Sequence, residues 1–163
     1  LNFNEYMKFL LFPLIGKDKK TVDDLVINFI ENKKEILFDE LSYELLNKHK
    51  NEKLLIASGA LDFIVKGFAN FFGVKDFLGT KAEFIDNLVS GETEDEPNFD
   101  KGKLKNVKKW CNEKGFILEE STFYTDSIHD LPLVEKCKNS ILVSPDDSLR
   151  EYATKNNLKI IDR

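Results

Sequence analysis

Apolar residues in the first third of the chain recur at three- and four-residue steps, which is the period of an amphipathic helix. They predict one helix over residues 3–11, a second that begins at Thr21, and a third over residues 39–50. Thr21 followed by Asp24 has the spacing of a capping box, in which two polar side chains satisfy the free N–H groups of a helix start. The N-terminal part is therefore expected to be helical.

From Lys53 onward the pattern changes to short apolar runs that alternate with helical stretches. Continuous apolar runs are typical of parallel strands that helices cover on both faces. We expect strands at 53–58, 77–82, 122–125, 140–143 and 158–161, helices at 61–72, 101–113, 131–137 and 149–155, and a small hairpin around Gly91. This alternation predicts an α/β fold with a Rossmann-like doubly wound parallel sheet. We expect a helical part over residues 1–36 and the α/β core over residues 37–163.

Composition narrows the class of protein. The 163 residues are 42% hydrophobic and include 14 phenylalanines, enough apolar surface to favour a folded chain over a disordered one. The net charge of -5 argues against a sequence-independent nucleic-acid binder. No apolar run approaches the roughly 20 residues of a membrane span, and the first residues lack a signal-peptide pattern. Cys111 and Cys137 without CxxC spacing indicate reduced thiols in a cytoplasmic protein.

Polar residues follow several of the predicted strands, where parallel sheets bind their ligands. Ser58 and Gly59 end the first strand, and a hydroxyl beside free backbone N–H groups suits an oxyanion. Asp126 and Asp130 follow a later strand with spacing that lets both face one pocket, and carboxylates suit Mg²⁺. Lys103 opens a helix, where its ammonium can neutralise phosphate. Together these residues predict a metal-assisted phosphate site.

Each of these residues also has a purely structural interpretation. Ser58 can be a turn residue or a helix cap, and Asp126 and Asp130 can cap the helix that follows them. Lys103 belongs to a run of lysines that would ordinarily form a solvated face. His129 lacks the partners of a zinc site and is expected to be an exposed turn residue.

The order of these residues resembles the haloacid dehalogenase (HAD) superfamily of phosphohydrolases, and within it the phosphoserine-phosphatase-like subfamily IB. The resemblance is carried by Ile56–Gly59 (IASG), Phe99–Lys103 (FDKGK), Tyr124–Pro132 (YTDSIHDLP) and Val143–Asp146 (VSPD). It implies Mg²⁺ as cofactor, a small phosphorylated metabolite as substrate, and a helical cap formed by the N-terminal part.

The resemblance also implies a role for each candidate residue. Ser58, together with Gly59, would bind the transferring phosphoryl group. Lys103 would stabilise that group and the charge of the nucleophile. Asp126 would ligate Mg²⁺, and Asp130 would support Lys103 or the metal shell.

One element of the family pattern does not occur in these 163 residues. The nucleophile of the family lies in a DxDx[T/V] motif after the central strand, and no such motif is present. Asp146–Asp147 follows the last strong strand and is expected to form an ordinary turn. Because a sheet without its central strand would leave buried backbone groups unpaired, we expect a segment beyond this chain to carry that strand and the nucleophile. A pseudoenzyme that lacks both is the alternative.

The leading hypothesis is a Mg²⁺-dependent phosphomonoester hydrolase that acts through an aspartyl-phosphate. A non-catalytic binding or regulatory protein on the same fold is the alternative. A signalling receiver domain would place its paired acids first and its lysine last, whereas Ser58 and Lys103 here precede Asp126. Thr125 and Ser127 replace the glycines of the GDGxND block of phosphoserine phosphatases, so another small phosphomonoester or a phosphorylated lipid headgroup remains a candidate substrate.

Overall fold

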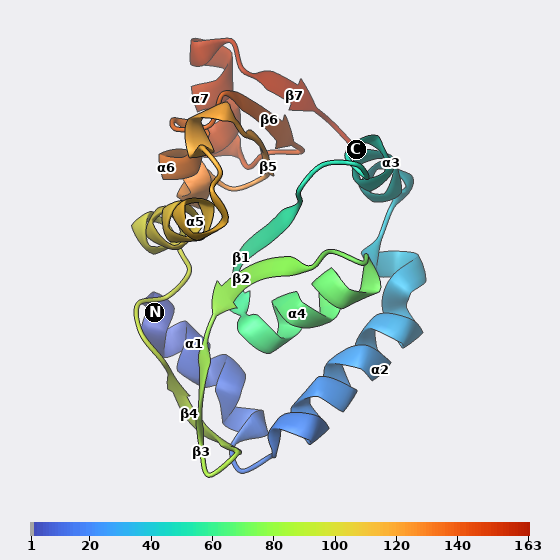
Figure 1. Cartoon of the computed structure of the whole chain (residues 1–163), viewed down its shortest axis with the longest axis vertical. Helices are drawn as coiled ribbons and strands as arrows, with labels where there is room; N and C mark the ends of the chain where they lie inside the picture. The colour runs from blue at the N-terminus through green and yellow to red at the C-terminus, as the bar shows by residue number, and fades with distance from the viewer. Residues whose placement is uncertain (1) are drawn as a thin grey trace. The chain divides into compact units, whose positions relative to one another are not determined.

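A computed structural model describes residues 2–163, and the chain forms two compact units, Leu1–Asn98 and Phe99–Arg163 (Figure 1). The first unit contains α1 (Phe3–Leu11), η1 (Phe12–Leu14), α2 (Lys19–Leu37), α3 (Glu40–Lys48), β1 (Leu55–Leu61), α4 (Asp62–Phe71), β2 (Asp76–Thr80), β3 (Ala82–Ile85) and β4 (Leu88–Thr93). The second contains α5 (Lys101–Lys114), η2 (Leu118–Glu120), β5 (Thr122–Thr125), η3 (Ile128–Asp130), α6 (Leu131–Val134), β6 (Asn139–Val143), α7 (Asp147–Asn156) and β7 (Lys159–Ile161). None of the helices within residues 2–163 is both long and apolar enough to cross a membrane.

Each unit contains a parallel sheet, as the alternation of strands and helices predicts. In the first unit β1 pairs with β2, with Ile56 opposite Phe77. In the second unit the strand order is β5-β6-β7, with Tyr124 opposite Ile141. The strands β3 and β4 form a separate antiparallel hairpin. Parallel strands joined by helices confirm the predicted α/β class.

The strands β1 and β5 each have one open edge. Within residues 2–163, β1 is hydrogen-bonded only to β2, and β5 only to β6. The prediction that the first strand is buried on both faces was wrong for the described residues, because most of β1 is only half-buried.

The core of the first unit joins its N-terminal helices to the hairpin and to α4. Helix α1 packs on β4, and α2 packs along α4 (Figure 1). The close approach of α2 and α4 requires Gly67, since a Cβ there would lie 2.3 Å from Cγ1 of Val26. The buried core consists of Met7, Leu11, Val22, Leu61, Phe63, Ala82 and Val89.

Aromatic rings join the end of α2 to the end of α4. Phe38, the C-terminal cap of α2, stacks on Phe71 with ring centroids 4.9 Å apart and meets Phe72 edge-on at 4.6 Å. Tyr43 of α3 meets Phe38 and Phe72 edge-on as well. These pairs add specific ring geometry to the burial of apolar area. The rings therefore fix the point at which the chain turns from α2 into α3.

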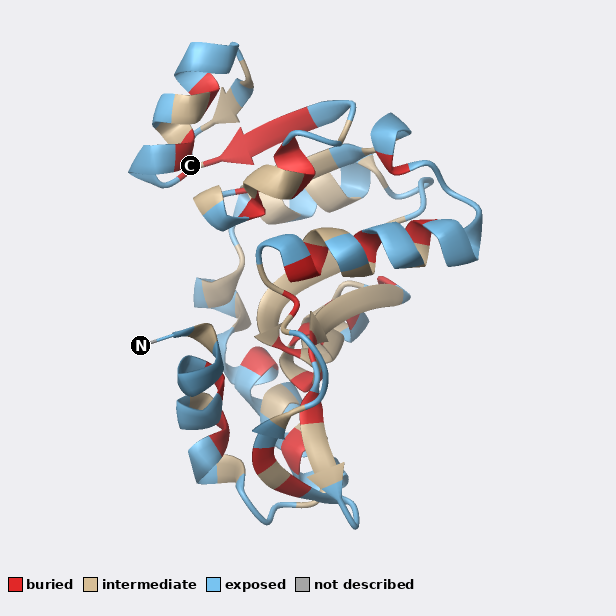
Figure 2. Ribbon diagram, turned by 90° about the vertical axis from the view of Figure 1, so that its left-hand side faces the viewer, coloured by how far each residue is buried: buried red, intermediate tan, exposed pale blue. Residues whose placement is uncertain are grey.

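The core of the second unit forms around β6, which is buried from Ser140 to Val143 (Figure 2). Its inward residues pack against α6 and α7 through Val134, Leu142, Leu149 and Ala153. A central strand with both edges paired is the expected position for such a run of buried apolar residues.

Three local predictions need correction. Helix α2 begins at Lys19, not at Thr21, because the carboxylate of Asp18 accepts hydrogen bonds from both the N–H and the hydroxyl of Thr21. The hairpin turns at Asp86–Asn87, both with positive φ, as a two-residue turn requires, whereas Gly91 lies within β4. Helix α6 ends at Val134 and not at residue 137, and the chain continues in turns where the N–H groups of Lys136 and Cys137 both bond the carbonyl of Leu133.

Candidate active site

Ser58 and Gly59 lie where β1 loses its regular pairing with β2. The register shifts between Ala57 and Leu61, so the strand runs past the predicted end at Ser58 but is irregular there. The hydroxyl of Ser58 accepts a hydrogen bond from the N–H of Ala60 at 3.2 Å. Irregular strand segments re-aim side chains out of the ladder and often lie beside functional sites. Ser58 is thus placed at the end of the regular strand pairing, where we expected an oxyanion-binding group.

A buried network of hydrogen bonds holds the backbone of Ser58 and Gly59 in place. Asn98, which is 0% exposed, donates from Nδ2 to the carbonyl oxygens of Ser58 at 2.8 Å and Leu78 at 3.1 Å. Its backbone N–H donates to the hydroxyl of Thr80, which in turn donates to the carbonyl of Gly59 at 2.8 Å. Sequence reasoning missed Asn98 and Thr80, because their partners lie about 20 to 40 positions earlier in the chain and leave no local pattern.

Replacing Asn98 with alanine is expected to lower the free energy of unfolding by about 2 kcal/mol, because two carbonyl groups would lose their donor. Urea denaturation measures this loss. The matched control is Asn32→Ala, because the exposed Asn32 side chain donates to the carbonyl of Asn28 within α2; it should cost about 0.5 kcal/mol or less. Equal losses in the two variants would contradict the role of the buried network.

In the second unit, Lys103 and Asp130 form a buried ion pair. Lys103 comes from the first turn of α5 and Asp130 from the end of η3, and each side chain is 8% exposed. Nζ of Lys103 donates to Oδ1 of Asp130, and the hydroxyl of Thr125 donates to Oδ2 at 2.7 Å. Both carboxylate oxygens are therefore engaged. The resemblance implies that Asp130 supports either Lys103 or the metal shell. The observed ion pair corresponds to the first of these two roles.

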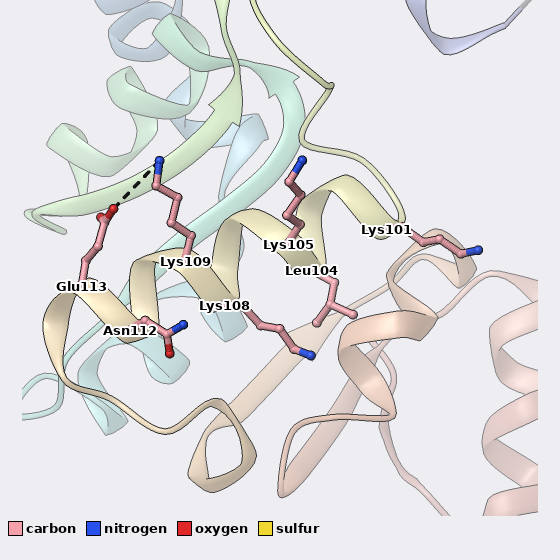
Figure 3. Close-up of a pocket in the computed structure, with 7 residues that line it drawn as sticks. All are labelled: Lys101, Leu104, Lys105, Lys108, Lys109, Asn112 and Glu113. Carbon is pink, nitrogen blue, oxygen red and sulfur yellow. Dashed lines mark ion pairs between the residues drawn. The ribbon is translucent and has the colours of Figure 1, made fainter.

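Lys103 differs from the other lysines of its helix. It shares the buried face of α5 with Val107 and Cys111, at four-residue steps. The exposed face carries Lys101, Lys105, Lys108 and Lys109, which line an open hollow of about 510 Å³ (Figure 3). The solvated-face interpretation therefore holds for these four lysines and not for Lys103. The four-residue step from Lys103 to two apolar residues is the sequence signal that separates it from the run.

Asp126 follows β5 directly, and its side chain is exposed. Across the part of the chain that the structure describes, its carboxylate has neither a hydrogen bond nor an ion pair, whereas its backbone carbonyl accepts from the N–H of Asp146 at 2.8 Å. Asp126 and Asp130 thus lie in different surroundings, although their spacing suggested a common pocket.

The carboxylate of Asp126 is chemically compatible with a Mg²⁺ ligand. Mg²⁺ commonly takes one or two carboxylates and completes its shell with water and substrate phosphate, and the exposed carboxylate of Asp126 at a strand end is a donor of this type. Residues 2–163 contain no cluster of three or more His, Cys, Asp or Glu side chains that could hold a metal by itself. Asp126 could therefore supply a ligand in a shell that other donors complete.

His129 and the two cysteines lie in surroundings that are typical of structural residues. The ring of His129 lies 4.6 Å from that of Phe99, and its backbone N–H donates to the hydroxyl of Ser127, as expected for a turn residue. Cys111 and Cys137 are free thiols. Burial raises the pKa of both, which is opposite to the lowered pKa of a nucleophilic cysteine.

Comparison with known proteins decides the family. Residues 1–135 match the family model described as haloacid dehalogenase-like hydrolase, and this range covers most of the chain. The chain belongs to this family. The HAD hydrolase family, which the order of Ser58, Lys103 and Asp126 suggested, is thereby confirmed, together with the prediction of an enzyme of the hydrolase class.

Related phosphatases resemble this HAD hydrolase over different shares of their length. A histidinol-phosphatase of Neisseria meningitidis serogroup C is 24% identical over 99% of this chain and 76% of its own length. A phosphoserine phosphatase of Mycobacterium tuberculosis is 30% identical over 58% of this chain, and the match spans only 30% of that relative.

Solved structures share the fold. A protein of unknown function from Bordetella pertussis Tohama I aligns with 99% of this chain and 75% of its own, with a TM-score of 0.91 and 25% identity. A substrate-bound phosphoserine phosphatase aligns with all of this chain and 73% of its own, with a TM-score of 0.71 and 19% identity. The predicted Rossmann-like fold class is therefore confirmed.

Proposed function

We propose that this HAD hydrolase is a Mg²⁺-dependent phosphomonoester hydrolase that acts through an aspartyl-phosphate intermediate. The observation that carries the proposal is the segment between β5 and α6, in which Asp126 has an exposed carboxylate without a partner among residues 2–163 and Asp130 has a buried carboxylate that holds Lys103. An ammonium fixed in this way is a preorganised positive charge, and such charges stabilise the transferring phosphoryl oxygens at no cost of reorganisation.

Each candidate residue would act on the phosphoryl group, on the metal or on a neighbouring side chain. Ser58 and the backbone N–H of Gly59 bind phosphoryl oxygens. Lys103 neutralises the charge that develops on the phosphoryl group and on the nucleophile, and Asp130 orients it. Asp126 would hold Mg²⁺, which would supply Lewis-acid polarisation of the phosphoryl oxygens when bound.

The attacking carboxylate is proposed to come from a segment outside these 163 residues, since no DxDx[T/V] motif occurs in them. Strands β1 and β5 are compatible with this, because within residues 2–163 each is paired along one edge only, and the backbone groups of the other edge could pair with a further strand. A strand that carries the nucleophile would satisfy those backbone groups.

The proposed substrate is a small phosphorylated metabolite. Among the relatives, one is named histidinol-phosphatase and another phosphoserine phosphatase, so histidinol phosphate and phosphoserine are the first two compounds to test. Thr125 donates its hydroxyl to Asp130, a contact that a glycine at this position could not make. The departure from the phosphoserine phosphatase block at this position is therefore compatible with a working Lys103–Asp130 pair, whichever compound is cleaved.

The full-length protein should hydrolyse para-nitrophenyl phosphate with Mg²⁺, and chelation by EDTA should reduce the rate by about 100-fold, because the metal supplies much of the charge stabilisation. Added Mg²⁺ should restore the rate. Release of phosphate from histidinol phosphate, phosphoserine and a phosphorylated lipid headgroup then ranks the substrates. Turnover that is absent, or that is unchanged by EDTA, would contradict the proposal and favour a non-catalytic binding protein on this fold.

A further inference from the structure

Asp146 connects three backbone groups of the second unit. It is the N-cap of α7, and its Oδ1 accepts from the N–H of Leu149 at 2.9 Å. Its Oδ2 accepts from the N–H of Ile128 at 2.7 Å. Its own backbone N–H donates to the carbonyl of Asp126 at 2.8 Å. The turn after β6, which the sequence presented as ordinary, is thus bonded to the segment that carries Asp126.

The two bonds to this segment lie on either side of Ser127. One fixes the carbonyl that follows the Cα of Asp126, and the other fixes the N–H of Ile128. Between them, the N–H of Ser127 donates to the hydroxyl of Thr125 at 3.2 Å. The backbone from Asp126 to Ile128 is therefore held at both ends, and its conformation limits the rotamers that the Asp126 side chain can adopt.

The turn that carries Asp146 is itself fixed. Ser144 adopts a positive φ of 44°, and its N–H donates to the carbonyl of Ile161. Its hydroxyl accepts from the N–H of Arg163 at 2.9 Å, and Pro145 is buried. Asp146 is consequently held by the β6–β7 side of the sheet and not by a mobile loop.

A helix cap needs one side-chain acceptor, and Oδ1 meets that need. The bond from Oδ2 to Ile128 goes beyond capping. We propose that Asp146 is a positioning residue that holds the Asp126 carboxylate in the orientation for metal binding. This inference rests on the proposed function, because it takes Asp126 to be the ligand of Mg²⁺. Groups that orient metal ligands in this way contribute roughly 10- to 100-fold to metal affinity.

The variant Asp146→Asn separates the capping of α7 from the bond to Ile128. Asparagine caps helices as well as aspartate does, so its Oδ1 keeps the bond to Leu149, while its amide NH₂ faces the N–H of Ile128 and cannot accept from it. A second variant, Asp146→Ser, keeps a cap, but its side chain is too short to reach Ile128. The control is Asp39→Asn at the N-cap of α3, where Oδ1 accepts hydrogen bonds from the N–H and the hydroxyl of Ser42 and asparagine keeps this oxygen.

In the full-length protein, both Asp146 variants should bind Mg²⁺ about tenfold more weakly by isothermal titration calorimetry. The Mg²⁺ concentration for half-maximal turnover of para-nitrophenyl phosphate should rise by a similar factor, and saturating Mg²⁺ should restore kcat. The Tm measured without metal should stay within about 2 °C of the wild-type value, as in Asp39→Asn.

Wild-type Mg²⁺ affinity in both Asp146 variants would overturn the positioning role and leave the proposed function standing. A Tm without metal that falls in both variants well below that of Asp39→Asn would assign Asp146 to folding and also overturn the role. If the wild-type protein itself bound no Mg²⁺ and turned over no phosphomonoester, the proposed function would fail first and the inference with it.

Discussion

The Asp126→Asn variant of the full-length protein is expected to lose Mg²⁺-dependent turnover by about 100-fold or more, with little change in its free energy of unfolding. The loss follows because an amide is a weaker ligand than a carboxylate for a hard cation, and charge stabilisation at a phosphoryl group carries most of the catalysis. Stability should be preserved because the carboxylate is exposed and has no hydrogen bond or ion pair with any residue between 2 and 163.

Turnover of para-nitrophenyl phosphate, calorimetric titration with Mg²⁺ and urea denaturation measure these three quantities. The matched control is Asp147→Asn, an exposed acid in the first turn of α7, which should change none of them appreciably. Unchanged turnover in Asp126→Asn would remove the proposed metal ligand and the mechanism built on it.

The Lys103→Met variant should lose both activity and stability, in contrast to Asp126→Asn. Methionine keeps much of the side-chain volume but leaves the Asp130 carboxylate buried with only the Thr125 hydroxyl as donor. Breaking a buried ion pair from one side costs about 3–5 kcal/mol. Turnover should fall by about 100-fold or more, because the preorganised charge on the phosphoryl oxygens is removed.

A double-mutant cycle tests whether the loss of stability comes from the broken ion pair and the loss of turnover from the missing ammonium. Lys103→Met combined with Asp130→Asn removes both charges, so the double variant should be more stable than the sum of the two single effects implies. Its turnover should remain low, because no ammonium is present. Lys108→Met on the exposed face of the same helix is the control for loss of a lysine and should have little effect on stability. Additive stability losses, or turnover that returns in the double variant, would contradict the proposed roles of the pair.

The regular elements of this protein follow from local patterns. The strand over residues 122–125 and the basic helix from Lys101 were predicted with bounds close to those of β5 and α5, because apolar periodicity and the glycine after a helix are local signals. The start of α2 was misplaced at Thr21, since Asp18 and Thr21 both have cap chemistry and the pattern alone does not rank them.

The candidate site likewise contains some residues that the sequence could identify and others that it could not. Ser58, Lys103 and Asp126 could be selected from the sequence because their side-chain types follow strands or open a helix. Asn98 and Asp146 could not, because their partners are distant in the chain. Hydrogen-bond networks of this kind depend on which loops the fold brings together, and that is not encoded in the spacing of neighbouring residues.

The sequence by itself determined the alternation of strands and helices, the α/β class and the chemical types available for a phosphate site, because each depends on local periodicity and on side-chain chemistry. Only the tertiary structure decided that Asp130 is buried against Lys103 while Asp126 stays exposed, and that Asp146 holds the backbone between β5 and α6. The physical reason is burial: two carboxylates four positions apart look alike in sequence, and packing decides which one is shielded from water and which one stays exposed.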